Sequence, residues 1–206
     1  MSEAPAGARV VLRRCPECGA SLLGEAGSVW FACTGCPQIV DVFGRLSGGV
    51  RTSRLRVETP EAGYHRPFFL FHLARSPELM KAIGPPRGHP QPTPETDRPL
   101  PVWVNAFRVD RVQIYGDVGA RLTAMRYDPG LVATPLDCPV ARGPKQALSI
   151  LRIRHRLGPE IPLDVVTVSV VALPWLADGH HLVDPLSGLS YPTALIRPHV
   201  ALTPAP

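Results

Sequence analysis

Two short cysteine pairs, Cys15-Pro16-Glu17-Cys18-Gly19 and Cys33-Thr34-Gly35-Cys36, follow each other with the spacing C-x2-C-x14-C-x2-C. At this spacing each pair places two thiols on one tight turn, and a hairpin between them brings the two turns together. Four sulfurs in a tetrahedral arrangement suit a zinc ion and leave no open position for water or substrate. The pattern therefore predicts a structural Zn²⁺ bound by Cys15, Cys18, Cys33 and Cys36.

The two cysteine pairs, with Gly19 after the first, resemble the knuckles of zinc-ribbon proteins, in which CPxCG turns alternate with short strands. The resemblance covers residues 10–46 and implies a small β module of the kind found in transcription, translation and replication proteins and in many bacterial proteins. Pro37 stands where these families usually have glycine, so one amide donor toward sulfur is missing, and Gly35 can compensate for it. The alternative interpretations are a chance pair of C-x-x-C motifs, two redox dithiols, or an iron site of the rubredoxin type.

The composition favours strands and turns, because the 206 residues include 25 prolines and 18 glycines. We expect an α+β, β-rich fold, with an N-terminal four-cysteine zinc ribbon followed by a mixed sheet domain with one or two short helices. The predicted divisions are a zinc ribbon at 8–46, a strand-rich connecting region with a short helix at 47–84, a proline-rich linker at 85–101, and a mixed α/β domain at 102–206 that ends in a β-meander.

Local patterns predict the individual elements. Ser76, Pro77 and Gly84 are suited to cap, begin and end a helix at 76–84. Residues 112–125 fit a helix or a strand, and so do residues 144–157. For the second stretch we prefer the helix, because Gly-Pro pairs stand at both of its ends. Apolar runs bounded by turn residues predict strands at 10–12, 29–32, 39–43, 50–57, 67–73, 102–109, 165–175, 180–183 and 189–196.

The net charge of +5 is concentrated in one segment, since five basic residues and no acidic residue lie between 142 and 156. On a helix, one face would carry Lys145, Ser149, Arg152 and Arg156, and Arg154 would intrude on the apolar face. The apolar face is expected to contain Ala147, Ile150, Leu151, Ile153 and Leu157. The simple interpretation is a solvated face. The functional one is a contact for an acidic partner, with Lys145, Arg152 and Arg156 as the partner-binding residues.

Two further groups of residues have structural explanations. Cys138 has no motif around it, so we expect a buried small hydrophobic residue. Asp178-Gly179-His180-His181, with Asp184, could form a second metal site, but Asp-Gly is a turn signal and adjacent histidines on a strand point to opposite faces. We therefore expect a hairpin there. The common nucleotide-binding and hydrolase motifs are missing from the sequence.

These observations lead to a non-enzymatic zinc-ribbon adaptor, or a structural subunit, in a cytoplasmic protein assembly of the bacterial type. The alternative is a nucleic-acid-binding zinc-ribbon protein in transcription, replication or repair, supported by Arg13, Arg14, Arg51, Arg54 and Arg56. A cytoplasmic location is expected because paired cysteine spacing with one cysteine left over suits a reducing compartment. The longest apolar stretch, 165–177, is too short to span a bilayer, so we expect no membrane insertion.

Overall fold

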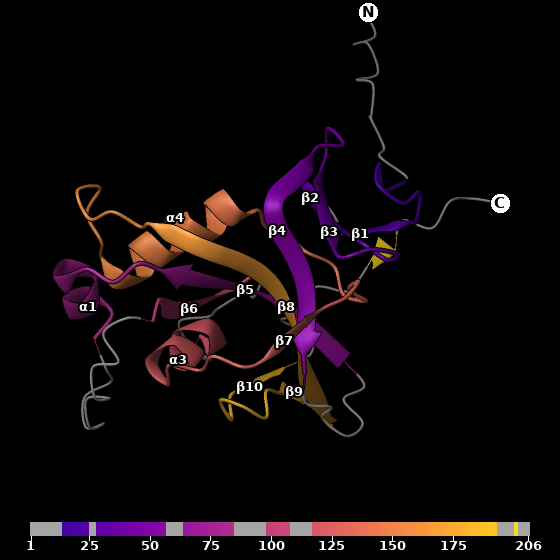
Figure 1. The fold of residues 1–206 in the computed structure, drawn as a ribbon. Coiled ribbons are helices and arrows are strands. Elements are labelled where there is room, and N and C mark those ends of the chain that lie inside the picture. The colour runs from indigo at the N-terminus through magenta and orange to yellow at the C-terminus, as the bar shows by residue number, and fades with distance from the viewer. Residues whose placement is uncertain are drawn as a thin grey trace, which may run out of the picture.

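The computed structural model describes residues 14–24, 28–56, 64–84, 98–107, 117–192 and 200–201 (Figure 1). Its strands are β1 (Leu22–Gly24), β2 (Trp30–Cys33), β3 (Gln38–Asp41), β4 (Leu46–Leu55), β5 (Tyr64–Leu73), β6 (Leu100–Asn105), β7 (Leu131–Ala133), β8 (Val165–Asp178), β9 (His181–Val183), β10 (Ser190–Pro192) and β11 (Val200–Ala201). Its helices are α1 (Pro77–Ala82), α3 (Val118–Ala124) and α4 (Pro144–His155).

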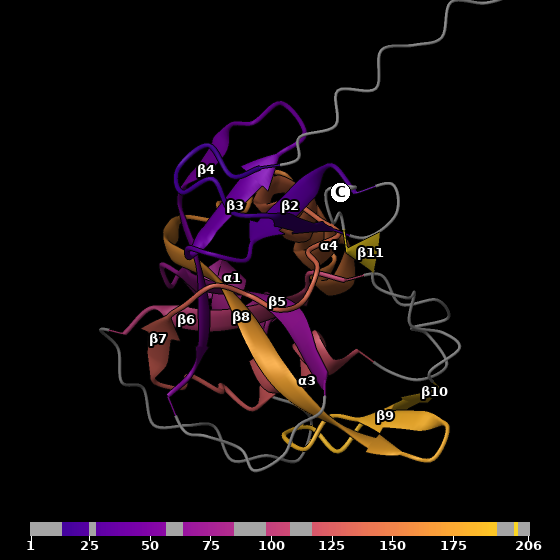
Figure 2. The same cartoon turned by 90° about the vertical axis from the view of Figure 1, so that its right-hand side faces the viewer.

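One mixed sheet connects all of these strands. Its main path runs β10-β9-β8-β4-β3-β2-β1-β11, while β5 pairs with β8 and β6, and β7 pairs with β4. The pairing of β4 with β8 is parallel, with Arg51 opposite Ser169, and the other pairs of named strands are antiparallel. The strands that carry the cysteines are therefore hydrogen-bonded, through β4, to the strands of the main core (Figure 2).

The central strands are buried on both faces. In β5, Phe69 and Phe71 point into a core that includes side chains of α1 and α4. Phe68 and Leu70 point into a second core that includes side chains of α3, β9 and β10. This alternation follows from the period of two in a strand, and it explains the unbroken apolar run of β5. The result is a sheet with α4 on one side and α3 on the other, as Figure 1 shows.

The predicted β-rich α+β fold class, with its N-terminal cysteine cluster, is confirmed. The stretch left open at 112–125 contains the helix α3, with residues 112–116 outside the described part. The preferred helix at 144–157 is α4, and the hairpin predicted around Gly179 joins β8 to β9. The predicted strand at 10–12 and most of the linker at 85–101 lie outside the described residues, while β1, β7 and β11 were not predicted. The division into domains stays a prediction.

Within the described residues, no helix is both long enough and apolar enough to cross a bilayer. The longest apolar stretch of the sequence forms most of β8, which is paired with β5 along one edge. Burial in the protein core explains the apolar character of residues 170–175 of this strand, whereas Val166 and Leu176 are exposed.

Gly119 lies in the first turn of α3, where this helix packs closely on β6. An added Cβ would lie 2.7 Å from Trp103 O and 3.0 Å from Asn105 Oδ1. Glycine to alanine normally stabilises a helix by about 1 kcal/mol, but here the obstacle is backbone of a buried strand. We expect Gly119→Ala to lower the free energy of unfolding in urea by about 1–3 kcal/mol.

Gly48→Ala is the control, because a Cβ at Gly48 would meet nothing within 4 Å. This variant should keep or slightly raise the stability, by less than about 0.5 kcal/mol. Equal stability of the two variants would contradict the close packing of α3 on β6.

Candidate metal centre

The first cysteine turn is built around Cys15 and Cys18. Cys15 O accepts a hydrogen bond from Gly19 N at 2.9 Å, and Cys15 N donates to Ala20 O at 2.8 Å. Gly19 has φ +74°, a conformation that favours glycine, and it turns the chain so that the amide of Ala20 donates to the thiol of Cys18. Arg14 Nη1 donates to Gly19 O at 3.2 Å, which keeps a positive charge beside the turn.

The second turn approaches the first so closely that only glycine fits at position 35. A Cβ on Gly35 would lie 2.6 Å from Ala20 Cβ and 3.3 Å from Cys18 Sγ. The amide of Gly35 donates to Cys33 Sγ at 3.3 Å. Pro37 has no amide hydrogen, and the following amide, Gln38 N, donates to Cys36 O at 2.8 Å. The two turns are therefore not equivalent, as Pro37 predicted.

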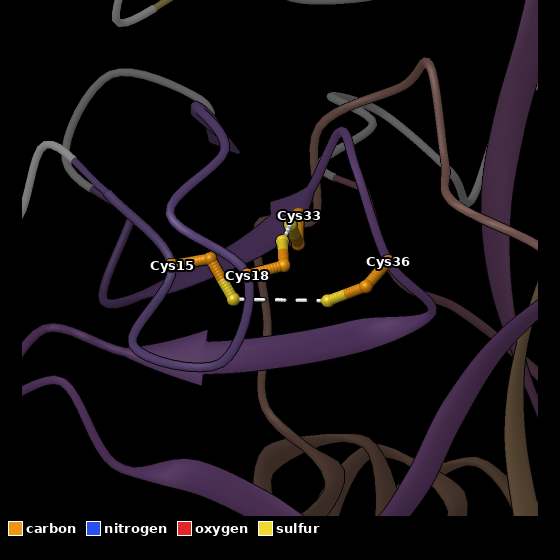
Figure 3. Close-up of side chains that lie close together, drawn as sticks. All are labelled: Cys15, Cys18, Cys33 and Cys36. Carbon is orange, nitrogen blue, oxygen red and sulfur yellow. Dashed lines mark hydrogen bonds between the residues drawn. The ribbon is translucent and has the colours of Figure 1, made fainter.

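The four sulfurs form one compact group (Figure 3). Cys15 Sγ lies 3.7 Å from Cys36 Sγ, and Cys18 Sγ lies 3.4 Å from Cys33 Sγ. All four Sγ atoms are within 4.8 Å of one another. Sulfurs bound about 2.3 Å from one central zinc ion would be about 3.8 Å apart, whereas a disulfide needs about 2.05 Å. The donor set and its spacing therefore suit a single tetrahedral metal ion that bridges the two turns.

The surroundings of the thiols influence their ionisation. The Ala20 amide, and then the Cys33 thiol, lower the pKa of Cys18, whereas burial raises the pKa of Cys33 and of Cys36. Buried thiolates need a neighbouring cation, because desolvation penalises their charge. A divalent metal ion supplies that cation and displaces the thiol protons.

The cysteine module, meaning residues 14–24 and 28–41, has a very small hydrophobic core of its own. That core contains five buried residues, and two of them are metal-ligand candidates: Cys15, Leu22, Phe31, Cys33 and Val40. The opposite side of the module contributes Ala32 and Ile39 to the main core. A bound metal ion would thus add stability on the face of the module whose own apolar core is very small.

The cysteine module also contacts the beginning of α4. A Cβ on Gly143, the N-cap residue of α4, would lie 2.1 Å from Trp30 Nε1, so the indole of β2 packs directly on the backbone there. Gly24, at the end of β1, forms an isolated parallel bridge with Val140. The module therefore positions the chain that leads into α4.

The other cysteine and histidine candidates do not join a metal cluster. Cys138 is buried, and burial raises the pKa of its thiol. A protonated, buried thiol packs as a small hydrophobic side chain, as predicted. Asp184 is fully buried and accepts a hydrogen bond from Ser187 N at 2.7 Å, within the turn between β9 and β10. Across the part of the chain that the structure describes, the four cysteines are the one group of three or more His, Cys, Asp or Glu side chains arranged like metal ligands.

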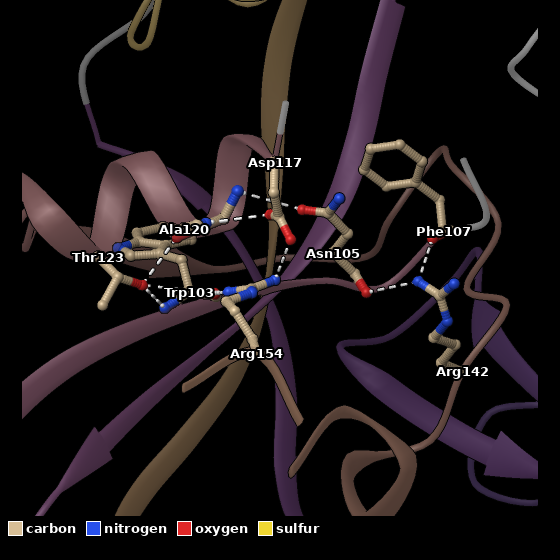
Figure 4. A network of polar contacts seen from close by, with 9 residues as sticks. Trp103, Asn105, Phe107, Asp117, Ala120, Thr123, Arg142 and Arg154 are labelled. Atoms are coloured by element: carbon tan, nitrogen blue, oxygen red, sulfur yellow. Dashed lines mark hydrogen bonds and ion pairs between the residues drawn. The ribbon is translucent and has the colours of Figure 1, made fainter. Parts of the chain in front are cut away.

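The basic segment forms α4, but its faces differ from the prediction at Ile153. Ala147 and Leu151 are buried as expected, whereas Ile153 is 78% exposed. The intrusion of Arg154 on the apolar side is confirmed: its Nη1 donates to Trp103 O at 2.8 Å, and its Nη2 pairs with Asp117 Oδ2 (Figure 4). The exposure of Ile153 could have been predicted from a helical wheel. At about 100° per residue, Ile153 lies a third of a turn away from the buried Ala147.

The three candidate partner-binding residues have different surroundings. Lys145 and Arg156 are exposed. Arg152 is half-buried, and its Nη1 donates to Gly158 O at 2.7 Å and to Ile161 O at 3.0 Å. Arg152 therefore holds the loop after α4, and the partner-binding role of all three residues stays a prediction.

Comparison of the chain with protein-family models, with curated proteins and with solved structures found no match.

The metal assignment is tested by Cys18→Ser. We expect the wild-type protein to hold one metal ion per chain in elemental analysis and the variant to lose it, because four thiolates at this spacing act as one ligand set. Backbone amides of β1, β2 and β3 should then lose protection from hydrogen exchange, while those of β5 and β8 keep it.

Cys138→Ala is the matched control for a lost cysteine. It should keep the metal ion and cost at most a few kcal/mol through lost packing. Full metal content and unchanged exchange in Cys18→Ser would contradict the site.

A substitution of Arg152 tests how much its hydrogen bonds stabilise the loop after α4. Arg152→Gln should lower the free energy of unfolding by about 1–3 kcal/mol, because two carbonyls lose a charged donor. Arg156→Gln, at the exposed neighbouring turn, should change it by less than about 0.5 kcal/mol. Thermal or urea unfolding compares the two, and equal effects would show that the two Arg152 contacts contribute nothing.

Proposed function

We propose that this chain is a non-enzymatic adaptor or structural subunit of a cytoplasmic protein assembly, in which a structural zinc ion folds an N-terminal zinc ribbon. The observation that carries the proposal is the set of four thiols that lie within 4.8 Å of one another. Four protein sulfurs complete the tetrahedron of a zinc ion, so the bound ion contributes folding free energy and offers no position to a substrate.

Zinc is the ion favoured by the donor set. Thiolate sulfur in a tetrahedral arrangement selects zinc or iron. The short hairpin of β1 and β2 between the two cysteine turns follows the zinc-ribbon pattern more closely than the rubredoxin pattern, in which the turns are much further apart in sequence. Zinc also has no redox chemistry, which agrees with a purely structural role.

An adaptor needs a rigid surface for its partner, and the contacts of the cysteine module support such a surface. Trp30 packs on Gly143, and Gly24 bridges to Val140, so the module fixes the N-terminal end of α4. The ion would in this way hold in place both the module and the helix that carries the excess positive charge of the chain.

The competing hypothesis is a nucleic-acid-binding ribbon. This hypothesis relies on five arginines, and two of them already interact with other residues of the protein. Arg14 donates a hydrogen bond to Gly19 O, and Arg54 forms an ion pair with Asp137 at 3.0 Å. Arg51, on β4, and Arg56, directly after it, are exposed and could contact phosphates. Arg13 lies outside the described residues.

Affinity purification of the tagged full-length chain from its native host, followed by mass spectrometry, tests the adaptor role. We expect a stoichiometric protein partner that survives nuclease treatment, and zinc rather than iron in elemental analysis of the purified complex. Recovery of the chain without any partner would contradict the adaptor hypothesis.

Titration of the protein with generic duplex and single-stranded DNA at several salt concentrations tests the nucleic-acid-binding hypothesis. Tight binding that weakens steeply with salt marks phosphate contacts, and it would favour the nucleic-acid hypothesis. Under the adaptor hypothesis we expect weak binding to both DNA probes.

A further inference from the structure

The outer face of α4 has no partner in the described structure. A helix advances about 100° per residue, so Gln146, Ile150 and Ile153 lie within about 60° of one another around α4, and Ile153 lies far from the buried Ala147 and Leu151. At 78%, Ile153 is the most exposed large apolar side chain among the described residues. Ile150, one turn earlier, is half-buried. Ile150 also packs against the main core, so the face offers the exposed Ile153 and only the outer part of Ile150 to the surroundings.

A hollow lies beside this face at the beginning of α4. Its volume is about 320 Å³. The lining residues are Ala141, Arg142, Gln146, Ser149 and Ile150. Ile150 thus forms part of the wall, and Ile153 continues the same strip one turn further along the helix. A hollow next to an exposed apolar strip is the shape that receives one apolar anchor of a partner.

The charged side chains of α4 are all basic. Lys145 is exposed near the first turn of α4, and Arg156 is exposed at the C-cap. The chain has no acidic residue between Asp137 and Glu160, so the helix contributes no negative charge to this face. Carboxylates of a partner would gain from both cations, whereas a basic partner would be repelled.

The inner side of α4 is held firmly, which makes its outer face a rigid platform. Arg154 ties the helix to Trp103 O and to Asp117, the N-cap residue of α3 (Figure 4). Arg152 ties its end to Gly158 O and Ile161 O. Docking on such a face costs little additional ordering of the helix.

We propose that the outer face of α4 docks an acidic protein segment, with one apolar side chain of that segment in the hollow beside Ile150 and with carboxylates opposite Lys145 and Arg156. The proposal rests on the adaptor function and specifies its partner. It places Ile153 at the centre of the contact, between the two cations.

A displayed library of random twelve-residue peptides, selected on the immobilised full-length protein, tests the proposal. We expect the enriched peptides to combine Asp or Glu with a large apolar residue. Ile153→Glu should weaken the affinity of a synthetic enriched peptide at least tenfold, because it removes the apolar contact and repels carboxylates. The fold should survive this change, since Ile153 is exposed.

Phe43→Glu is the matched control, because Phe43 is 74% exposed on the turn between β3 and β4. It should leave the peptide affinity within twofold of the wild type. The proposal is overturned if no peptide is enriched, if the enriched peptides lack acidic residues, or if they bind Ile153→Glu as well as the wild type. Self-association that Ile153→Glu abolishes in size-exclusion chromatography would also overturn it, because the face would then be covered by a second copy.

The two proposals can fail separately. If the native partner is recovered equally by wild-type and Ile153→Glu chains, the adaptor role stands and the docking face is wrong. If the wild-type chain recovers no partner, the adaptor role itself fails.

Discussion

Strand β8 is hydrogen-bonded along both of its edges, and the rest of the structure depends on this double pairing. One edge pairs in parallel with β4, and the other pairs with β5 over nearly the whole length of that strand. Residues 170–175 of β8 are buried, because both faces of the sheet are covered in this region. Since β4 also pairs with β3, the position of the cysteine module relative to the main core follows from the register of β4 on β8.

The cysteine module is stabilised by two different interactions on its two sides. One side adds Ala32 and Ile39 to the main core, where apolar burial favours folding. The other side places four thiols around a small core. A metal ion bound there would supply folding free energy that the small apolar core does not. Because Trp30 of this module packs on Gly143, the same arrangement determines where α4 begins. The cysteine module, the sheet and α4 thus form one connected unit.

Features encoded by nearby residues were predictable from the sequence. The cysteine spacing predicted the sulfur cluster, the Gly-Pro pairs predicted both ends of α4, and a β-branched run predicted β8. Pairing between distant strands was not predictable, because the parallel register of Arg51 with Ser169 leaves no local signal. The short strands β1 and β7 are too brief to show a period, and their neighbours in the sheet define them. At Ile153, apolar character suggested burial, but the angular position on the helix determines exposure.

The parallel pairing of β4 with β8 also has a consequence for synthesis of the chain. On the ribosome, β4 emerges long before β8, so one of its edges has no native partner until the C-terminal third has been made. An open edge on a nascent chain is a template for pairing with another chain. Arg51 and Arg54 lie in β4, and Arg56 follows it directly. Like charges on such an edge disfavour its pairing with the same edge of a second copy.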